Sequence, residues 1–461
     1  MTSQTQKSNR KDRKFEGMQI INPHAAGIDL GSESHWVCLP GDGSVDDRVK
    51  EFKTDTPSLE ELADWLGKAG VTTVAMESTG VYWIPLYELL DARGYEVILA
   101  DTRTVSSVPR RKTDVLDCQW IQQLHACGLL AGAFRPGEEI VKFRSLVRKH
   151  TVFTQKAADW LRRLQKDMDQ MNIRVHRAVS DISGATGMRI IHAIVDGERD
   201  PAKLADMRDP RCSLSKKEIQ RQLTGNWRDE HLFNLKLDLQ TYEYMLGCLS
   251  ELEAKIRELL AGMRTVSEPP PPPTSRSKGK QMDKRGEEPL RQALYMMAGA
   301  DLTAIDSIGV GTAQTVLSEI GPDVSMFPTE KHFTSYLRLA PGTAVSGGKA
   351  IRGKKNKPQL GSSRTREALM MAALSAGKTQ TALGAYYRSV AVRRGPGIAV
   401  FATARKLAQY IYRLLRFGRE YVDIGVEEYE RRNNDRRLKA LKARARQMGY
   451  ALINIEQTTL S

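Results

Sequence analysis

The stretch AAGIDLGSESHWVCL, residues 25–39, decides the fold of the first part of the chain. Its small and apolar residues predict a strand, a tight turn at Gly31-Ser32 and a returning strand. Residues 49–54 are expected to form a third strand, antiparallel to these two. On the first strand, alternation places Gly27, Asp29 and Gly31 on one face and apolar Ile28 and Leu30 on the other.

Downstream of these strands, helical and extended patterns alternate. Residues 58–68 have leucines at helical spacing and are closed by Gly70, and a β-branched strand ends at Glu77. A second helix stops at Gly94, and residues 96–100 form a last strand. Three antiparallel strands followed by β-α-β units is the element order of the ribonuclease H-like fold, so we expect an α/β domain of this class.

Four acidic residues occupy positions that such a fold brings together. Asp29 lies in an apolar strand, where a lone carboxylate is costly to bury unless it is paired or ligates a cation. Glu77 ends a second strand, and Asp114 and Asp117 share one face of a helix. For either aspartate alone, a helix-start acid that complements the dipole is the better interpretation. Together the four supply oxygen ligands for two Mg²⁺ ions, with Mn²⁺ as an expected substitute.

Residues 142–266 are predicted to be almost wholly helical. Leu232, Leu235, Leu239, Tyr242 and Leu246 follow steps of three and four, the spacing of a coiled-coil seam. Two interpretations stay open. The seam either packs against a helix at residues 143–171 within the chain, or it supports self-association.

Five consecutive prolines, residues 269–273, and a polar stretch after them predict an extended or disordered linker. Beyond it, mainly helical segments flank a Gly- and Lys-rich loop, and residues 427–446 are expected to be a solvated helix or tail. The expected organisation is a disordered basic tail (1–24), a nuclease domain (25–141), a helical coiled-coil region (142–266), a linker (267–288), a C-terminal domain (289–420) and a charged tail (421–461).

The C-terminal half carries a cationic loop with no acid before Glu367. Phosphate contact is the natural use of such a run, and a solvated loop is the alternative. Its cations are Lys349, Arg352, Lys354, Lys355, Lys357, Arg364 and Arg366. Upstream, Gly309 and Gly311 precede a helix, where backbone amides can approach a phosphate, although such glycines are also common packing devices. On residue types alone, Ser346-Gly347-Gly348 is an ordinary turn.

Composition agrees with a polyanionic partner. The chain has 70 Lys+Arg against 55 Asp+Glu, a formal net charge of +15 that attracts nucleic acid over a long range. Its five cysteines are scattered, without a CxxC pair, which argues against a disulfide framework and a zinc site. No apolar run reaches the roughly 18 residues that span a bilayer. We therefore expect a cytoplasmic protein without membrane partners.

Three segments, GIDLGSESHWV, AMESTGVYW and RKTDVLDCQWIQQL, resemble the acidic blocks of the DEDD transposases of bacterial insertion sequence family 110. The N-terminal domain of that family is similar to the RuvC Holliday-junction resolvase. The resemblance implies that Asp29, Glu77, Asp114 and Asp117 form a catalytic metal-binding tetrad. Asp101 has no acidic counterpart in the family pattern and is left out.

The second half resembles the same family. LTAIDSIGVGTAQTVLSEIG is similar to its helix-hairpin-helix segment, with Gly309 and Gly311 in the turn. Ser346 matches the family's nucleophilic serine, and Ser362 and Ser363 are second choices. The resemblance implies strand cleavage and rejoining through a phosphoserine, guided by a bridge RNA, in an assembly that pairs halves of different protomers. The implied partners are double-stranded DNA at element ends and target, a structured guide RNA, and further copies of the chain as a dimer or tetramer.

Three other functions are weighed against this one. A junction-resolving nuclease would use the same acids with water as the nucleophile, which leaves the serine region without a chemical role. An actin-like or chaperone-like ATPase is suggested by GIDLGS, but no second phosphate loop or adenosine motif follows. A non-catalytic nucleic-acid-binding scaffold would keep its activity after the loss of Asp29.

Overall fold

The computed structural model describes residues 18–41, 44–77, 80–100, 113–130, 132–210, 212, 214–273, 279, 282, 286–341, 345–346, 349–350, 363–418 and 425–452. The chain divides into two units, Met1–Arg135 and Pro136–Ser461. Each unit is built around its own hydrophobic clusters and is described in turn. The domain limits expected from the sequence remain predictions.

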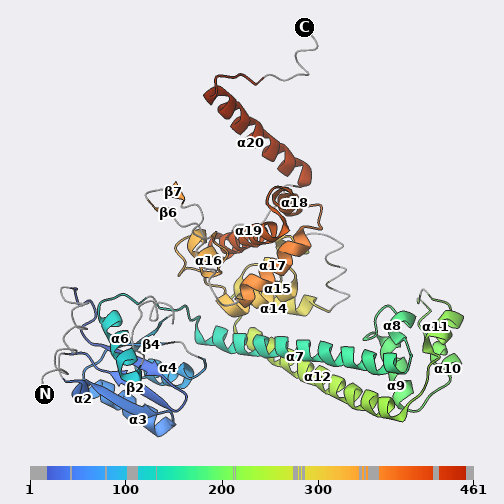
Figure 1. Cartoon of the computed structure of the whole chain (residues 1–461), viewed down its shortest axis with the longest axis horizontal. Coiled ribbons are helices and arrows are strands. Elements are labelled where there is room, and N and C mark those ends of the chain that lie inside the picture. Colours follow the sequence, from blue (N-terminus) through green and yellow to red (C-terminus); the bar gives the residue numbers. More distant parts are fainter. Residues whose placement is uncertain are drawn as a thin grey trace. The chain divides into compact units, whose positions relative to one another are not determined.

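The first unit contains a mixed five-stranded sheet (Figure 1). Its strand order is β3-β2-β1-β4-β5. β2 pairs antiparallel with both β1 and β3, whereas β1, β4 and β5 pair in parallel. This arrangement confirms the predicted α/β sheet, with antiparallel strands followed by β-α-β units. The strands are β1 (Ala25–Leu30), β2 (Ser34–Cys38), β3 (Val49–Lys53), β4 (Thr73–Glu77) and β5 (Glu96–Ala100).

Helices cover both faces of this sheet. α3 (Thr56–Lys68) and α4 (Trp83–Ala92) bury their leucines against Ile28 and Met76, which point to one face. α6 (Asp114–Ala126) lies on the other face, where Ala75 packs with Ile121 and Leu124 of the helix. A single turn, α2 (Val45–Arg48), precedes β3. The period-2 alternation of the strands thus separates a leucine-rich layer from a layer of small residues.

The second unit begins with a long helical hairpin. α7 (Glu138–Gln170) and α12 (Asp229–Gly262) run side by side in opposite directions (Figure 1). Leu235, Leu239 and Tyr242 of α12 are buried in a cluster with residues of α7. Intrachain packing therefore accounts for this part of the seam, while Leu246 remains 42% exposed. Between the two long helices come α8 (Val175–Ala178), α9 (Ala185–Val195), α10 (Pro201–Asp206) and α11 (Lys216–Leu223).

The rest of this unit is mainly helical, with a short β-hairpin. Its core gathers buried residues of α14 to α19, and it also includes Phe143 of α7 and Leu260 of α12. The Pro-rich segment therefore joins two stretches that share one core. The elements are α14 (Glu288–Ala298), η2 (Leu302–Ala304), α15 (Val310–Ile320), α16 (Glu330–Tyr336), β6 (Val345–Ser346), β7 (Lys349–Ala350), α17 (Arg364–Ala376), α18 (Ala382–Arg394), α19 (Pro396–Phe417) and α20 (Val426–Gln447).

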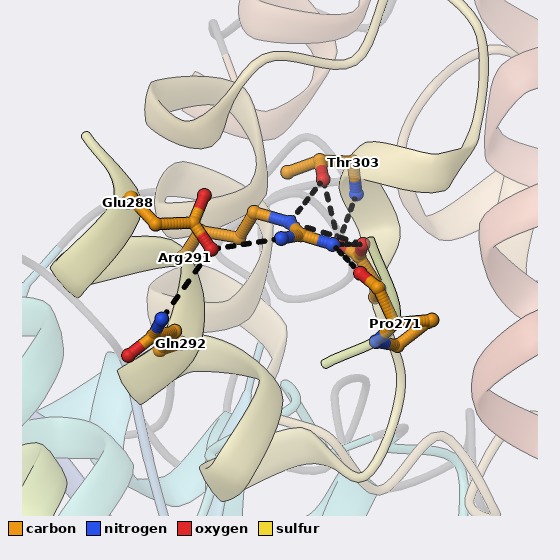
Figure 2. Close-up of polar contacts among 6 residues, drawn as sticks. Pro271, Glu288, Arg291, Gln292 and Thr303 are labelled. Atoms are coloured by element: carbon orange, nitrogen blue, oxygen red, sulfur yellow. Dashed lines mark hydrogen bonds and ion pairs between the residues drawn. The ribbon is translucent and has the colours of Figure 1, made fainter. Parts of the chain in front are cut away.

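A buried arginine holds the proline run to this core (Figure 2). Arg291 is 2% exposed, and its guanidinium lies 2.6 Å from Asp301 Oδ2 and 2.9 Å from Glu288 Oε1. It also donates to Thr303 Oγ1 and to the carbonyl oxygen of Pro271. Because a buried cation needs partners for its donors, this network fixes Pro271 beside α14.

We expect Arg291→Met to lower the free energy of unfolding by about 3–5 kcal/mol, because it leaves the Asp301 carboxylate, whose side chain is only 9% exposed, uncompensated. Urea denaturation of the full-length protein measures the effect. The control is Lys255→Met, which removes an exposed ion pair with Glu258 and should cost less than about 1 kcal/mol. Equal costs for the two variants would show that the Arg291 network does not stabilise the core.

Candidate active site and nucleic-acid surface

The site in the first unit depends on a close approach of β1 and α6. A Cβ atom at Gly27 would lie 2.2 Å from the backbone nitrogen of Gln122 and 2.5 Å from the carbonyl oxygen of Cys118. The Gln122 side chain donates to the carbonyl oxygen of Ala25 at 3.1 Å. The helix thus rests directly on the strand backbone. Since Ala25 lies beside Gln122 and Gly27 beside Cys118, Asp29 is directed toward the first turn of α6.

The four predicted acids converge at this end of the helix. Ile28 pairs with Met76 in the parallel β1–β4 register, so the next residues, Asp29 and Glu77, are neighbours on adjacent strands. Both follow the alternation of Gly27 and Ala75 and face α6. Asp114 and Asp117 lie in the first turn of that helix. The N-cap is Thr113, whose hydroxyl accepts from the Leu116 amide, so capping is not the role of either aspartate.

The pKa of Asp29 reflects its proximity to the other three carboxylates. The pKa of Asp29 is raised from 3.8 to about 6. Burial is the largest cause, followed by repulsion from Asp117, Glu77 and Asp114. A hydrogen bond with the backbone at Leu30 opposes the shift. An acid destabilised by three others has the environment of a cation-binding or proton-transfer group.

The donor set suits a hard divalent cation in kind, because it consists of carboxylate oxygens from two strands and one helix. Within the described residues, no group of three or more His, Cys, Asp or Glu side chains is close enough to enclose one metal ion. The structure therefore brings the predicted tetrad to one place without a closed coordination shell. Asp101 lies outside the described residues.

Sequence reasoning missed the residues that hold α6 in place. His125 is 1% exposed, and its Nε2 lies 2.9 Å from Thr73 Oγ1 on β4. Burial lowers the pKa of His125, so the ring is neutral at physiological pH. The available signal was the row of small residues on one strand face, Ala25 and Gly27 on β1 with Ala75 on β4, which leaves room for a helix backbone.

Gly27→Ala is expected to lower the free energy of unfolding by about 3 kcal/mol or more, because the new methyl group must displace the α6 backbone. Thermal denaturation and hydrogen exchange of the β1 amides measure this in the full-length protein. Gly247→Ala in α12 is the control, since nothing lies within 4 Å of its Cβ position. There alanine should be neutral or stabilise by about 0.5–1 kcal/mol. An undisturbed β1 in Gly27→Ala would contradict the proposed contact.

In the second unit, Gly309 is the N-cap residue of α15 and Gly311 lies in its first turn. Both are exposed, and nothing lies within 4 Å of a Cβ built at either position. Ser307, just before them, has φ 63°, a left-handed conformation that turns the chain into the helix. The space around this helix start leaves room for an anion at its amides, and the role of Gly309 and Gly311 in phosphate binding stays a prediction.

Ser346 lies in the hairpin of β6 and β7, where its backbone pairs with Lys349. Residues 347 and 348 separate the two strands. Among the second choices, Ser363 caps α17, its hydroxyl accepting from the Arg366 amide at 3.5 Å, and Arg364 is the first residue of that helix. The remaining predicted residues of the loop lie outside the described residues: Arg352, Lys354, Lys355, Lys357 and Ser362.

Comparisons with known proteins match both parts of the chain. A family model of the DEDD type for insertion element IS110, described as "Transposase", matches residues 26–173. A second model, "Transposase IS116/IS110/IS902 family", matches residues 299–388. The chain belongs to the IS110 family of transposases. The insertion element IS110 uncharacterized 43.6 kDa protein of Streptomyces coelicolor is 32% identical over 130 residues, which are 27% of this chain and 31% of the relative.

The IS110 matches contain the candidate site residues. The first includes Asp29, Glu77, Asp114 and Asp117, and the second includes Gly309, Gly311 and Ser346. The chain spans about a third of the length of the Streptomyces relative, 31%. Residues 1–25, 174–298 and 389–461 lie outside both models, so α12, α19 and α20 are matched by neither. None of the helices in the described part of the chain has the length and apolarity to cross a membrane.

Proposed function

We propose that this IS110-family chain is the transposase of an insertion sequence, and that it cuts and rejoins DNA strands with a metal-dependent acidic site and a serine nucleophile. The observation that carries the proposal is the convergence of Asp29, Glu77, Asp114 and Asp117 from two strands and a helix, with a raised pKa at Asp29. The strand order and the position of the acids support a RuvC-like nuclease domain.

Asp29, Glu77, Asp114 and Asp117 are the residues that would hold the metal. Their mutual repulsion raises the energy of the ionised cluster, and a bound cation relieves it. Two Mg²⁺ ions, or Mn²⁺ in their place, would polarise the scissile phosphate and stabilise the charge that develops on its oxygens. Asp29 and Glu77 project from paired strands of the sheet, so little backbone entropy is lost when they ligate.

Ser346 is the proposed nucleophile. Its hydroxyl oxygen attacks the phosphorus of a DNA phosphodiester, one backbone P–O bond breaks, and the hydroxyl proton ends on the released deoxyribose hydroxyl. The reverse attack by a deoxyribose hydroxyl restores the phosphodiester and frees the serine. Because the phosphoserine keeps the bond energy, rejoining needs no other energy source. In the sequence, Ser346 is followed by Gly347 and Gly348, which have no side chains, and this favours the close approach of a phosphate.

Binding of DNA is assigned to two parts of the second unit, the start of α15 and the cationic run of the sequence between residues 349 and 366. Gly309 and Gly311 offer helix-start amides to a phosphate, and the cations from Lys349 to Arg366 release counterions when they neutralise phosphates. By the family resemblance, a structured guide RNA and further copies of the chain complete the assembly. The protein would act in the bacterial cytoplasm on nucleoid DNA.

The test is an adduct assay on the full-length protein. The protein is incubated with duplexes that contain the element ends and with a transcript of the flanking non-coding DNA, in Mg²⁺ or in EDTA, and is then denatured. We expect a denaturation-resistant protein–DNA adduct in Mg²⁺ and none in EDTA. Metal-dependent cleavage without an adduct would instead assign the reaction to water, as in a junction-resolving nuclease. Cleavage that is unaffected by EDTA would overturn the metal site.

A further inference from the structure

The last helix of the chain has a divided charge. In the first half of α20, Glu428 lies within 2.6 Å of both Arg431 and Arg432. In the second half no acid occurs between Asp435 and Leu452. Six exposed cations lie there, and none forms an ion pair within the described residues: Arg436, Arg437, Lys439, Lys442, Arg444 and Arg446. The second half therefore carries uncompensated charge.

The positive charge in the second half of α20 exceeds what would complement the helix dipole at its C-terminal end. Cations in the last turn, such as Arg444 and Arg446, complement the helix dipole. Lys439 and Lys442 lie further upstream, three residues apart, and repel each other. A partner with closely spaced negative charges would remove this repulsion.

The cations form two rows on the helix surface. At about 100° per residue, Arg437 and Arg444 share one side, and Lys439, Lys442 and Arg446 lie about half a turn away. Midway between the rows are Leu438 and Leu441, which are 46% and 52% exposed. The helix thus presents an apolar strip with a row of positive charge along each edge.

The first half of α20 is tied to the rest of the unit. The rings of Tyr386 on α18 and Tyr429 on α20 meet edge to face at 6.4 Å, and Lys406 of α19 lies 5.9 Å from the Tyr429 ring. The pKa of Lys406 is lowered by burial and then by the positive charge of Arg436. The contacts hold one end of the helix and leave the cationic rows exposed.

We propose that the second half of α20 binds in the major groove of duplex DNA, with one row of cations on the phosphates of each strand. An α-helix with side chains is about 10–12 Å across, which matches the roughly 12 Å width of the B-DNA major groove. Leu438 and Leu441 would face the groove floor, where thymine methyl groups make apolar contacts. Duplex RNA fits less well, because its major groove is too narrow for side chains to read. The inference rests on the DNA substrate of the proposed function.

The test compares two variants with equal loss of charge on the same helix. Lys439→Gln/Lys442→Gln removes two cations of one row, and Arg431→Gln/Arg432→Gln removes two cations that are paired with Glu428. Glutamine preserves helix propensity, and circular dichroism checks the helix content. Affinity of the full-length protein for a 30-base-pair duplex of arbitrary sequence is measured by fluorescence anisotropy at several salt concentrations.

We expect the Lys439/Lys442 variant to bind duplex DNA about tenfold more weakly at physiological salt. The slope of log K against log salt concentration should fall in magnitude by about one to two, because one or two phosphate contacts are lost. The control should stay within about twofold of the wild type. Equal affinity of both variants and the wild type would overturn the inference, as would a loss confined to duplex RNA of the same sequence or to anionic lipid vesicles. If DNA binding is unchanged while the wild type still forms the serine adduct, the α20 inference fails and the proposed function stands.

Discussion

Replacing Asp29 with asparagine is expected to abolish metal-dependent strand cleavage and, at neutral pH, to make the first unit more stable. Asparagine has nearly the same shape but no charge to hold a divalent cation. Metal catalysis contributes several kcal/mol to a transition state, and each 1.36 kcal/mol is a factor of ten in rate. Cleavage should therefore fall by at least about a thousandfold. Binding of duplex DNA should stay within a few-fold, because other residues contact phosphate.

The gain in stability follows from the raised pKa of Asp29. The pKa of this carboxyl rises from its ordinary value of 3.8 to about 6 in the folded chain, chiefly through burial and then through repulsion by Asp117, Glu77 and Asp114. The folded state thus favours the protonated acid. The contribution of protonated Asp29 to the free energy of unfolding is fully present below about pH 4 and is lost as the pH rises through about 6. At pH 7 the ionised carboxylate costs about 1–2 kcal/mol after allowance for partial exposure, and Asn removes that cost.

Hydrogen exchange of the β1 and β4 amides in the full-length protein, from pH 5 to pH 8, measures the stability effect. The wild type should lose protection as the pH rises relative to Asp29→Asn, and added Mg²⁺ should restore protection only in the wild type. Asp91→Asn, a change at an exposed acid on α4, is the control and should follow the wild type. A cleavage-competent Asp29→Asn protein, or a wild type indifferent to Mg²⁺ in both assays, would refute the metal site.

Ser346→Ala is expected to eliminate the covalent protein–DNA adduct completely. Alanine has no oxygen to bond to phosphorus, and the backbone pairing of Ser346 with Lys349 is independent of the side chain. The hairpin should therefore persist, and DNA affinity should remain within about twofold. Denaturing gels detect the adduct, and mass spectrometry of the digested complex locates the modified residue.

Ser363→Ala is the matched control for Ser346→Ala. Its hydroxyl caps α17, so its removal should cost about 1 kcal/mol of stability and leave the adduct in place. Ser362→Ala should likewise leave the adduct in place. An adduct that persists in Ser346→Ala, or that maps to another residue, would overturn the nucleophile assignment and leave the acids acting through water.

The local elements were predictable because their signals lie in adjacent residues. The alternation from Ala25 to Leu39 and the helical spacing after Ser58 led to strands and a helix that the structure confirms within a few residues. α18 could not be recognised in this way. It packs through small residues instead of an apolar stripe, and a Cβ atom at Gly384 would lie 2.2 Å from the carbonyl oxygen of Thr379.

By itself the sequence determined the periodic elements, the candidate acids and serine, and the resemblance that the IS110 family models confirm. The tertiary structure alone decided that buried seam residues of α12 pack on α7, that Arg291 ties Pro271 to the C-terminal core, and that α6 rests on Gly27. The reason is physical. Periodicity shows which face of a helix or strand is apolar and which is polar. It does not show which distant element packs against that face, because shape and charge select this element only when the two faces meet in the folded protein. The raised pKa of Asp29 likewise depends on acids up to 88 positions away in sequence, at Asp117.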